Sequence, residues 1–288
     1  MILILISLLG MGLFLWPFSG LGLPTSTPAL VIALGTALGL LVFEIGTRRM
    51  DARSFALLAA LSATDAALRA ALVTGIGGFS PIFLLVLCGG YALGPSFGFL
   101  VGAGSLLTSA LVTGGLGPWV PYQLFAVGWV GTLAGVAGSW RRHRPPGRLD
   151  VALLAVVGLA TGFGFGAVMD IWNWTFYAGS GQLGWTPQLA PLTAVGRFAR
   201  YYLLTSLGYD SFRAVGNALM VMLFGLPILV GLQRVGRRLR LNWPDPSDAA
   251  ASALPPHHQA VRDLVVPGLV AGVDSRPPEP DQAGRQVQ

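Results

Sequence analysis

The amino-acid sequence predicts an all-α membrane protein, a polytopic bundle of about eight transmembrane helices. Of its 288 residues, 53% are hydrophobic and only 10% are charged, whereas soluble domains carry about 25% charged residues. Apolar stretches long enough to cross a bilayer recur along the chain. All 18 basic residues are arginines, which excludes lysine-dependent chemistry such as Schiff-base formation. Basic loops are typical of the cytoplasmic side of a membrane protein, so the net charge does not indicate a nucleic-acid partner.

Residues 1–50 are predicted to form two N-terminal transmembrane helices. Residues 2–22 are apolar and show neither the basic start nor the small-residue cleavage site of a signal peptide, so we expect a retained helix. A second apolar stretch at 28–47 ends in Thr47-Arg48-Arg49. Glu44, near the end of this stretch, is expected to reach the membrane surface.

Residues 51–241 are predicted to form a six-helix core, followed by a disordered cytoplasmic tail at 242–288. The expected helices cover 53–73, about 80–95, about 97–113, about 119–140, about 150–172 and about 211–233. Glycine and proline predict a short loop at 114–118. The connection at 173–208 is rich in Trp, Tyr, Gly and Pro and is expected to be a long binding loop. The tail is rich in Pro, Asp and Ala and has no sustained apolar period.

The positions of the arginines predict the topology, because arginine is enriched in cytoplasmic loops. Eight spans place both termini in the cytoplasm, together with Arg48, Arg49, Arg53 and the RRHRPPGR loop at 141–148. The loops at 75–80, 114–118 and 173–208 then lie outside. Arg197 and Arg200 lie on the outer side and depart from the rule.

The helix expected at 53–73 has two faces of different composition. Asp65 and Arg69 are four residues apart and can pair with each other, and at about 100° per residue they lie opposite an alanine face. Small residues spaced four apart let another helix approach closely. These alanines are either a partner-binding surface or packing within the bundle. The two charged residues are either a functional site, the default for ionisable groups in a membrane, or a structural ion pair. The alanine face comprises Ala59, Ala63, Ala67 and Ala71.

Aromatic and hydrogen-bonding residues gather at the expected outer ends of the helices. Apolar walls with a few polar groups are typical of small-molecule sites, so we expect substrate binding there. An aromatic belt at the membrane surface explains the tryptophans, but it does not explain Asp170 and Asn173 beside them. The candidate substrate-binding residues are Asp65, Arg69, Trp119, Tyr122, Gln123, Asp170, Trp172, Asn173 and Asn217.

Several catalytic classes lack their motifs. The histidines, at 143, 257 and 258, all lie in the predicted cytoplasmic loop or tail. There is no HExxH zinc motif, no paired acidic DDxxD-type cluster and no GxSxG elbow. The single cysteine, Cys88, lies in an apolar run and is expected to be a buried, inert thiol. We therefore expect no catalytic residue, metal or cofactor, and the chain is not expected to be an enzyme.

Three segments resemble the substrate-binding S components of energy-coupling factor transporters. The first is GGYALGPSFGFLVGAGSLLTSALVTGGLGPWVPYQLFAVGWVGTLAG, residues 89–135, which contains a GPWxPxQ loop followed by a glycine-rich helix. The second, MDIWNW at 169–174, resembles an M-N-x-W segment, and the third, TSLGYD at 205–210, resembles a TSxxxD segment before the last helix. The resemblance covers about 53–240 and is closest to the cobalamin-type branch of these vitamin transporters.

The resemblance implies a six-helix core that captures a vitamin from outside through loops at 75–80, 114–123 and 170–209. It implies that Ala59 and Ala63, extended by Ala67, bind a membrane coupling subunit, which two cytoplasmic ATPase subunits drive. It also implies a multi-pass protein of a prokaryotic plasma membrane. Cobalamin or another corrinoid is the favoured substrate, and a smaller vitamin or a nucleobase-like compound is compatible. The two N-terminal helices, the tail and Asp170, where Asn is more typical, depart from the pattern.

Two other functions remain open from the sequence. The chain is alternatively an integral membrane enzyme or lipid-handling protein that uses Asp65, Arg69 and Asp170. It is also compatible with a scaffold whose glycine and alanine faces only assemble other membrane proteins.

Overall fold

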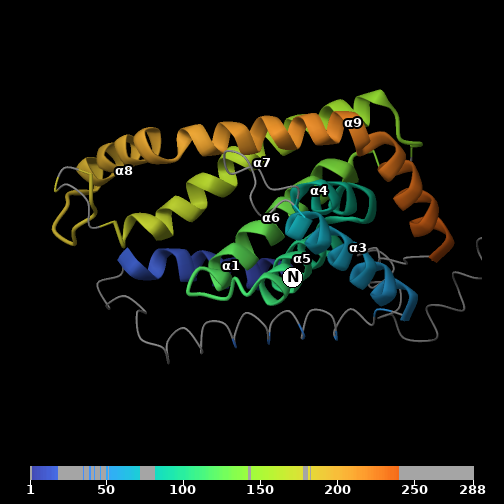
Figure 1. The fold of residues 1–288 in the computed structure, drawn as a ribbon, viewed down its shortest axis with the longest axis horizontal. Helices are drawn as coiled ribbons and strands as arrows, with labels where there is room; N and C mark the ends of the chain where they lie inside the picture. Colours follow the sequence, from blue (N-terminus) through green and yellow to red (C-terminus); the bar gives the residue numbers. More distant parts are fainter. Residues whose placement is uncertain are drawn as a thin grey trace, which may run out of the picture. The chain divides into compact units, whose positions relative to one another are not determined.

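The chain folds into α-helices, which confirms the predicted all-α class (Figure 1). The computed structural model describes residues 2–18, 50, 52–71, 82–141, 144–177, 181 and 183–239, and the single positions 35, 39, 42 and 46. The helices in these residues are α1 (Ile2–Leu15), the short 3₁₀ helix η1 (Trp16–Phe18), α3 (Ala52–Ala71), α4 (Ile82–Leu93), α5 (Pro95–Thr113), α6 (Val120–Ser139), α7 (Arg148–Trp174), α8 (Pro191–Thr205) and α9 (Leu207–Leu239).

Within the described residues, five helices are long and apolar enough to cross a membrane: α3, α5, α6, α7 and α9. Helices α1 and α4 are apolar but shorter. The chain is therefore a multi-pass membrane protein, as its composition predicts. The predicted helix at 28–47, apart from its four single positions, lies outside the described residues, as do the loop at 75–80 and the tail at 242–288.

Glycine and proline set several helix boundaries. Proline is in the first turn of α5, α6 and α8, where its missing N–H leaves no helical hydrogen bond unmade. Helix α5 ends at Gly114, whose φ of 68° lies in the left-handed region that glycine reaches without steric cost. The turn after it occupies residues 114–119, so the predicted short loop is confirmed.

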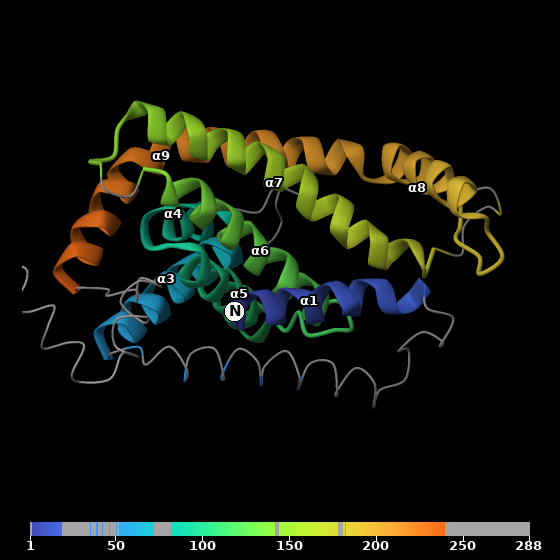
Figure 2. The same cartoon turned by 180° about the vertical axis from the view of Figure 1, so that it is seen from behind.

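Helices α4, α5 and α6 approach one another closely through glycines. A Cβ atom built on Gly90 would overlap the carbonyl of Gly131, and a Cβ on Gly131 would overlap the carbonyl of Gly98. Close backbone approach of this kind is how small residues stabilise helix pairs in membranes. The three helices thus form the centre of the described bundle (Figure 2).

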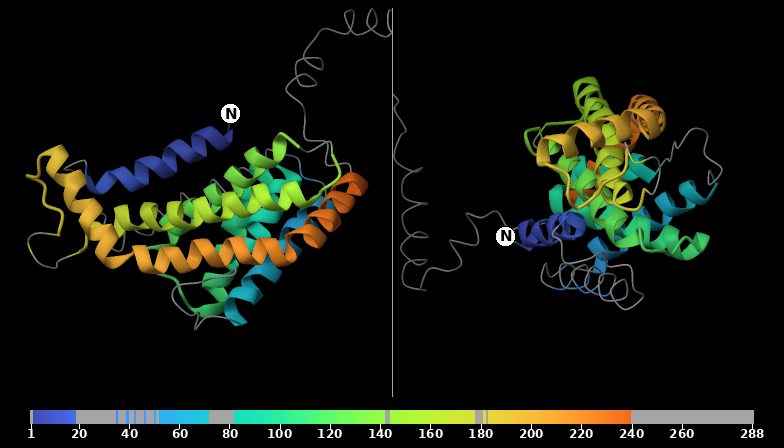
Figure 3. Two further views of the ribbon diagram at one scale, coloured as in Figure 1. Left: turned by 90° about the horizontal axis from the view of Figure 1, so that it is seen from above. Right: turned by 90° about the vertical axis from the view of Figure 1, so that its left-hand side faces the viewer.

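Helices α7 and α9 run antiparallel, side by side (Figure 3). Gly166 lies against Asp210, Gly162 against Ala214, and Gly158 close to Asn217, so residue numbers rise along one helix as they fall along the other. The end of α7 therefore meets the start of α9. This register brings the candidate residues of α7 close to the TSLGYD segment.

A network of hydrogen bonds around Asp150 stabilises the end of the bundle where α7 begins. The Tyr91 hydroxyl donates a 2.8 Å hydrogen bond to Oδ1 of Asp150, and Arg141 Nε donates to the same oxygen at 2.7 Å. The hydrogen bond to Asp150 raises the pKa of the Arg141 guanidinium. The Gly147 amide donates to Oδ2 of Asp150 at 2.9 Å, which caps the first turn of α7. Asp150 thereby joins α4, the α6–α7 connection and α7.

The prediction that 173–208 is a loop is wrong, because residues 191–205 form α8. Proline at its first position and a run of helix-compatible residues start this helix. Its presence accounts for Arg197, which the topology rule left unexplained. Arg197 Nη1 donates to the carbonyl of Gly181 at 2.9 Å, so this arginine holds α8 against the connection that precedes it.

Candidate functional site

An aromatic cluster joins α6 and α7 beside α1. The ring centroids of Tyr122 and Trp172 are 5.1 Å apart, and Phe14 of α1 lies edge-on to Tyr122 at 5.1 Å. Tyr122 and Trp172 are both buried. Tyr122 of the GPWxPxQ segment thus lies against Trp172 of the MDIWNW segment.

A buried acidic pair lies on another side of α7. Asp170 of α7 and Asp210 of α9 are both buried, and each has an Oδ2 atom without a hydrogen-bond partner. Arg213 forms an ion pair with Oδ1 of Asp210, and its guanidinium lies 5.1 Å from the centre of the Phe165 ring. Gly166 makes room for the carboxylate, because a Cβ there would overlap Asp210. Two carboxylates face one arginine, which leaves the cluster with a net negative charge when both are ionised.

Hydroxyl groups of α8 and of the α8–α9 junction border this acidic pair. Ser206 lies beside Asp170, and Tyr202 lies beside Asp210. Burial, together with the negative charge of Asp210, raises the pKa of Tyr202 to about 12. Burial also raises the pKa of Tyr201. Both tyrosines therefore remain neutral hydrogen-bonding groups at physiological pH.

Aromatic residues cover this end of α7. Trp174 Nε1 donates to the carbonyl of Leu183 at 2.7 Å, and its ring lies 5.4 Å from that of Phe198 on α8. The ring centroids of Tyr177 and Tyr201 are 5.0 Å apart, and the ring planes are tilted by 58°. Trp185 lies 5.2 Å from Phe18, which follows α1. Residues from η1, α7, α8 and the connection before α8 thus form one aromatic cap.

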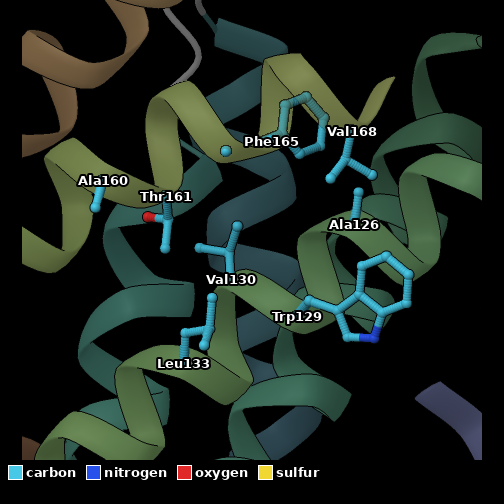
Figure 4. Close-up of a pocket in the computed structure, with 9 residues that line it drawn as sticks. Ala126, Trp129, Val130, Leu133, Ala160, Thr161, Phe165 and Val168 are labelled. Carbon is cyan, nitrogen blue, oxygen red and sulfur yellow. The ribbon is translucent and has the colours of Figure 1, made fainter. Parts of the chain in front are cut away.

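An apolar groove of about 220 Å³ lies between α6 and α7 (Figure 4). Val130 of α6 points toward Thr161 of α7, and Val168 of α7 points toward Ala126 (Figure 4). The Thr161 hydroxyl is bonded within its own helix, to the Val157 carbonyl at 2.8 Å. The groove therefore offers shape and apolar surface, with no free polar side chain. It is lined by Ala126, Trp129, Val130, Leu133, Ala160, Thr161, Gly164, Phe165 and Val168.

The remaining predicted residues occupy different surroundings. Trp119 is 40% exposed, and its indole N–H donates to the Gly115 carbonyl at 3.2 Å, which folds it over the turn. Gln123 is half-buried and Asn173 is exposed. Asn217 is buried, with Nδ2 3.4 Å from the Gly158 carbonyl, so it joins α7 to α9.

Asp65 and Arg69 lie apart from these residues. Both are on α3, which contacts α5 and α4. Asp65 is fully buried, whereas Arg69 is half-buried. Neither carboxylate oxygen of Asp65 accepts a hydrogen bond from Arg69, although the positive charge of Arg69 acts on this carboxylate. The predicted site residues thus fall into separate groups along the bundle.

The alanines of α3 lie on its exposed face. Ala59, Ala63, Ala67 and Ala71 are all exposed, while Leu58, Ser62 and Asp65 on the other face are buried. The predicted division of α3 into an alanine face and a polar face is therefore present. An exposed small-residue face is sterically open to a second helix.

The predicted site residues included neither Asp210 nor Ser206. Asp210 pairs with Arg213 three residues away, which concealed its proximity to Asp170, forty residues earlier in the chain. The TSLGYD segment contains both residues and was the available signal. The groove between α6 and α7 is harder to predict from the sequence, because its residues Ala160 and Gly164 are recognisable only as two small residues four positions apart.

The acidic pair and its cap combine hydrogen-bond acceptors, neutral hydroxyls and aromatic faces, which suits binding of a polar small molecule with apolar parts. No group of three or more His, Cys, Asp or Glu side chains that could hold a metal occurs in the part of the chain that the structure describes. Comparison of the chain with protein-family models, curated proteins and solved structures found no match.

Proposed function

We propose that this chain is the substrate-binding subunit of an energy-coupling factor type importer and that it captures a vitamin or related small molecule at the aromatic end of the bundle. The observation that carries the proposal is the buried pair Asp170 and Asp210, whose free carboxylate oxygens lie under an aromatic cap. Buried polar atoms without partners cost about 1–3 kcal/mol each. A bound ligand with hydrogen-bond donors offsets that cost.

The substrate chemistry follows from the same groups. Tyr201 and Tyr202 supply neutral hydroxyls, and Trp174 and Trp185 supply apolar faces. The resemblance to the cobalamin-type branch favours cobalamin or another corrinoid, whose amide side chains are hydrogen-bond donors. The substrate enters from outside if the arginine-rich end, with Arg141, faces the cytoplasm.

The alanine face of α3 supports the proposal that the chain binds a membrane coupling subunit. A helix of a membrane coupling subunit packs along Ala59, Ala63 and Ala67, because small side chains permit close backbone contact. The sequence has no lysine-containing phosphate loop. Two cytoplasmic ATPase subunits therefore supply the energy through the coupling subunit, in a prokaryotic plasma membrane.

The test is to identify what co-purifies with the chain. The protein is expressed with its neighbouring transport genes, extracted in mild detergent and examined by mass spectrometry of proteins and small molecules. We expect a coupling subunit, two ATPase subunits and a vitamin. Asp170→Ala is expected to retain less than a tenth of the vitamin, because it removes both buried carboxylate acceptors. Ser211→Ala, which changes an exposed hydroxyl nearby, is the matched control.

A protein that purifies alone with only lipid contradicts the proposal. The groove between α6 and α7 favours a second candidate, a lipid-handling protein, because its apolar lining suits an acyl chain. Asp65 and Arg69 lie on α3, whereas Asp170 lies at the α7–α9 contact, so one catalytic centre does not contain all three. Turnover of an added phospholipid by the purified chain alone would favour this candidate.

A further inference from the structure

Helix α8 presents an apolar stripe that no described residue covers. The four side chains of this stripe fall within about 80° of one another, at about 100° per residue. The opposite face of the helix is occupied: Tyr201 is buried beside Tyr177, and the Phe198 ring lies 5.4 Å from that of Trp174. The proposed function uses only this inner face. The exposed stripe comprises Leu192, Val195, Ala199 and Leu203.

Helix α8 is too short to cross a bilayer. Its 15 residues extend over about 22 Å at 1.5 Å per residue, whereas the hydrocarbon core is about 30 Å thick. It ends at Ser206, whose φ of −121° interrupts the helical backbone, and Figure 3 shows α8 turned away from the axis of α9. A short amphipathic helix with an unpaired apolar face is typical of helices that lie in the membrane–water interface.

The length of α7 gives the level of α8 in the membrane. The ion pair of Asp150 with Arg141 marks one membrane surface at the start of α7. From Asp150 to Trp174 the helix advances by about 36 Å at 1.5 Å per residue, which exceeds the hydrocarbon thickness of about 30 Å. Trp174 therefore lies at the opposite surface, where tryptophan is enriched. Phe198 packs against Trp174, so α8 lies at the same level.

The stripe of α8 continues the lipid-facing surface of α9. Helix α9 is long and apolar enough to cross the membrane, so its exposed apolar side chains, such as Phe212, face the acyl chains. Exposed leucines follow one another across the α8–α9 junction at Leu203, Leu204 and Leu207. Lipid that covers the start of α9 therefore also reaches the stripe of α8.

A free arginine borders this stripe. Arg200 is about 60° from Leu203 around the helix. It is exposed, and no carboxylate of the described residues forms an ion pair with it. Arg197 differs, because its guanidinium is bonded to the Gly181 carbonyl. A guanidinium beside an apolar face is suited to a lipid phosphate, which it binds through charge-assisted hydrogen bonds.

We propose that α8 lies in the bilayer surface at this end of the bundle, with its stripe against the acyl chains and Arg200 on the phosphate of an anionic phospholipid. The partner of this surface is thus the membrane itself. The contact accounts for Arg200, which the distribution of arginines between the two sides of the membrane left unexplained. It also keeps the aromatic cap at the level of the headgroups.

The first test measures the depth of α8 in the full-length chain, in nanodiscs of phosphatidylcholine and phosphatidylglycerol. Leu203→Cys carries a fluorophore, and the unsubstituted chain is the blank because Cys88 is completely buried. References are Leu219→Cys, exposed on α9, and Pro145→Cys, exposed in the α6–α7 connection. We expect lipids with brominated acyl chains to quench position 203 about as strongly as position 219, and aqueous iodide to quench it about tenfold less than position 145.

Two outcomes of this test would overturn the proposal. Quenching of position 203 by iodide, with none by brominated lipid, would place the stripe in water. Quenching by neither agent would show that protein covers it. Leu203 is 58% exposed, so its replacement by cysteine leaves the packing of the bundle intact.

The second test addresses Arg200 in the same labelled chain. Brominated phosphatidylglycerol is expected to quench position 203 at about one-fifth of the mole fraction that brominated phosphatidylcholine requires, because a nearby arginine attracts anionic headgroups. Arg200→Gln should make the two lipids equivalent, and Arg200→Lys should retain the preference. No preference in the parent chain, or a preference that survives in Arg200→Gln, would exclude contact of Arg200 with a lipid phosphate.

Discussion

Tyr91 donates a buried 2.8 Å hydrogen bond to Oδ1 of Asp150, a residue 59 positions later in the chain. This contact joins the last turn of α4 to the first turn of α7. Arg141 bonds to the same carboxylate oxygen. One acidic side chain thereby fixes how three parts of the bundle meet at the arginine-rich end.

Tyr91→Phe is expected to lower the free energy of unfolding by about 1.5 kcal/mol, which is typical of a hydrogen bond to a charged acceptor. Asp150 keeps Arg141 and the Gly147 amide as partners, so the fold should persist. The measurement is chemical or thermal unfolding in detergent. Tyr209→Phe, at an exposed tyrosine of α9, is the control. Equal stability of the two variants would show that the hydrogen bond between Tyr91 and Asp150 does not stabilise the fold.

Gly131→Ala is expected to destabilise the bundle by about 2–3 kcal/mol, because the new methyl group meets backbone atoms that cannot move aside. Its Cβ would overlap the carbonyl of Gly98 on α5. Gly231→Ala on α9 meets no atom within 4 Å and is expected to stabilise by about 0.5–1 kcal/mol through helix propensity. Opposite signs of the two changes in unfolding free energy are the result to look for; two similar changes would contradict the close contact of α5 and α6.

Tyr202 is expected to ionise in the folded protein only near pH 12, above the ordinary tyrosine pKa of about 10. Because the pKa is raised on folding, the stabilisation is complete below about pH 10 and is lost as the pH rises through about 12. Ultraviolet absorption reports tyrosinate directly. A component near pH 12 should be missing in Tyr202→Phe and present in Tyr209→Phe. An unchanged titration curve in Tyr202→Phe would show that this hydroxyl is not shielded by Asp210.

Ala63→Trp is expected to abolish co-purification with the coupling subunit while leaving the fold and vitamin content unchanged. The residue is exposed on α3, so a larger side chain meets no described neighbour but blocks close approach of a partner helix. The fraction of coupling subunit recovered per chain is the quantity to measure. Phe55→Trp, at another exposed position of the same helix, controls for added bulk. Recovery of the partner at wild-type level by Ala63→Trp would exclude this face as the docking surface.

The sequence was sufficient to predict most of the helices because a span needs only a long apolar stretch between turn residues. Helices α5, α6 and α7 begin and end within about two residues of the predicted positions. Helix α8 was not predicted, because it lacks such a long apolar stretch. It is amphipathic and contains Arg197 and Arg200, so hydropathy does not distinguish it from a polar loop.

The two faces of α3 were also accessible from the sequence, since helical periodicity alone separates Ala63 from Asp65. The residues that surround these two faces could not be predicted from the sequence. The absence of a hydrogen bond between Asp65 and Arg69, and the presence of Ser105 beside Asp65, depend on which helix packs against α3.

By itself, the sequence determined that this protein is an all-α, multi-pass membrane protein, because hydropathy, helical period and turn residues are local properties. Only the tertiary structure decided which side chains meet. It placed Tyr122 against Trp172 and Asp170 near Asp210, and it put Asp65 elsewhere. The physical reason is that contacts between distant segments depend on helix register, and register is set by close approach at glycines such as Gly131 and Gly166 rather than by any local pattern.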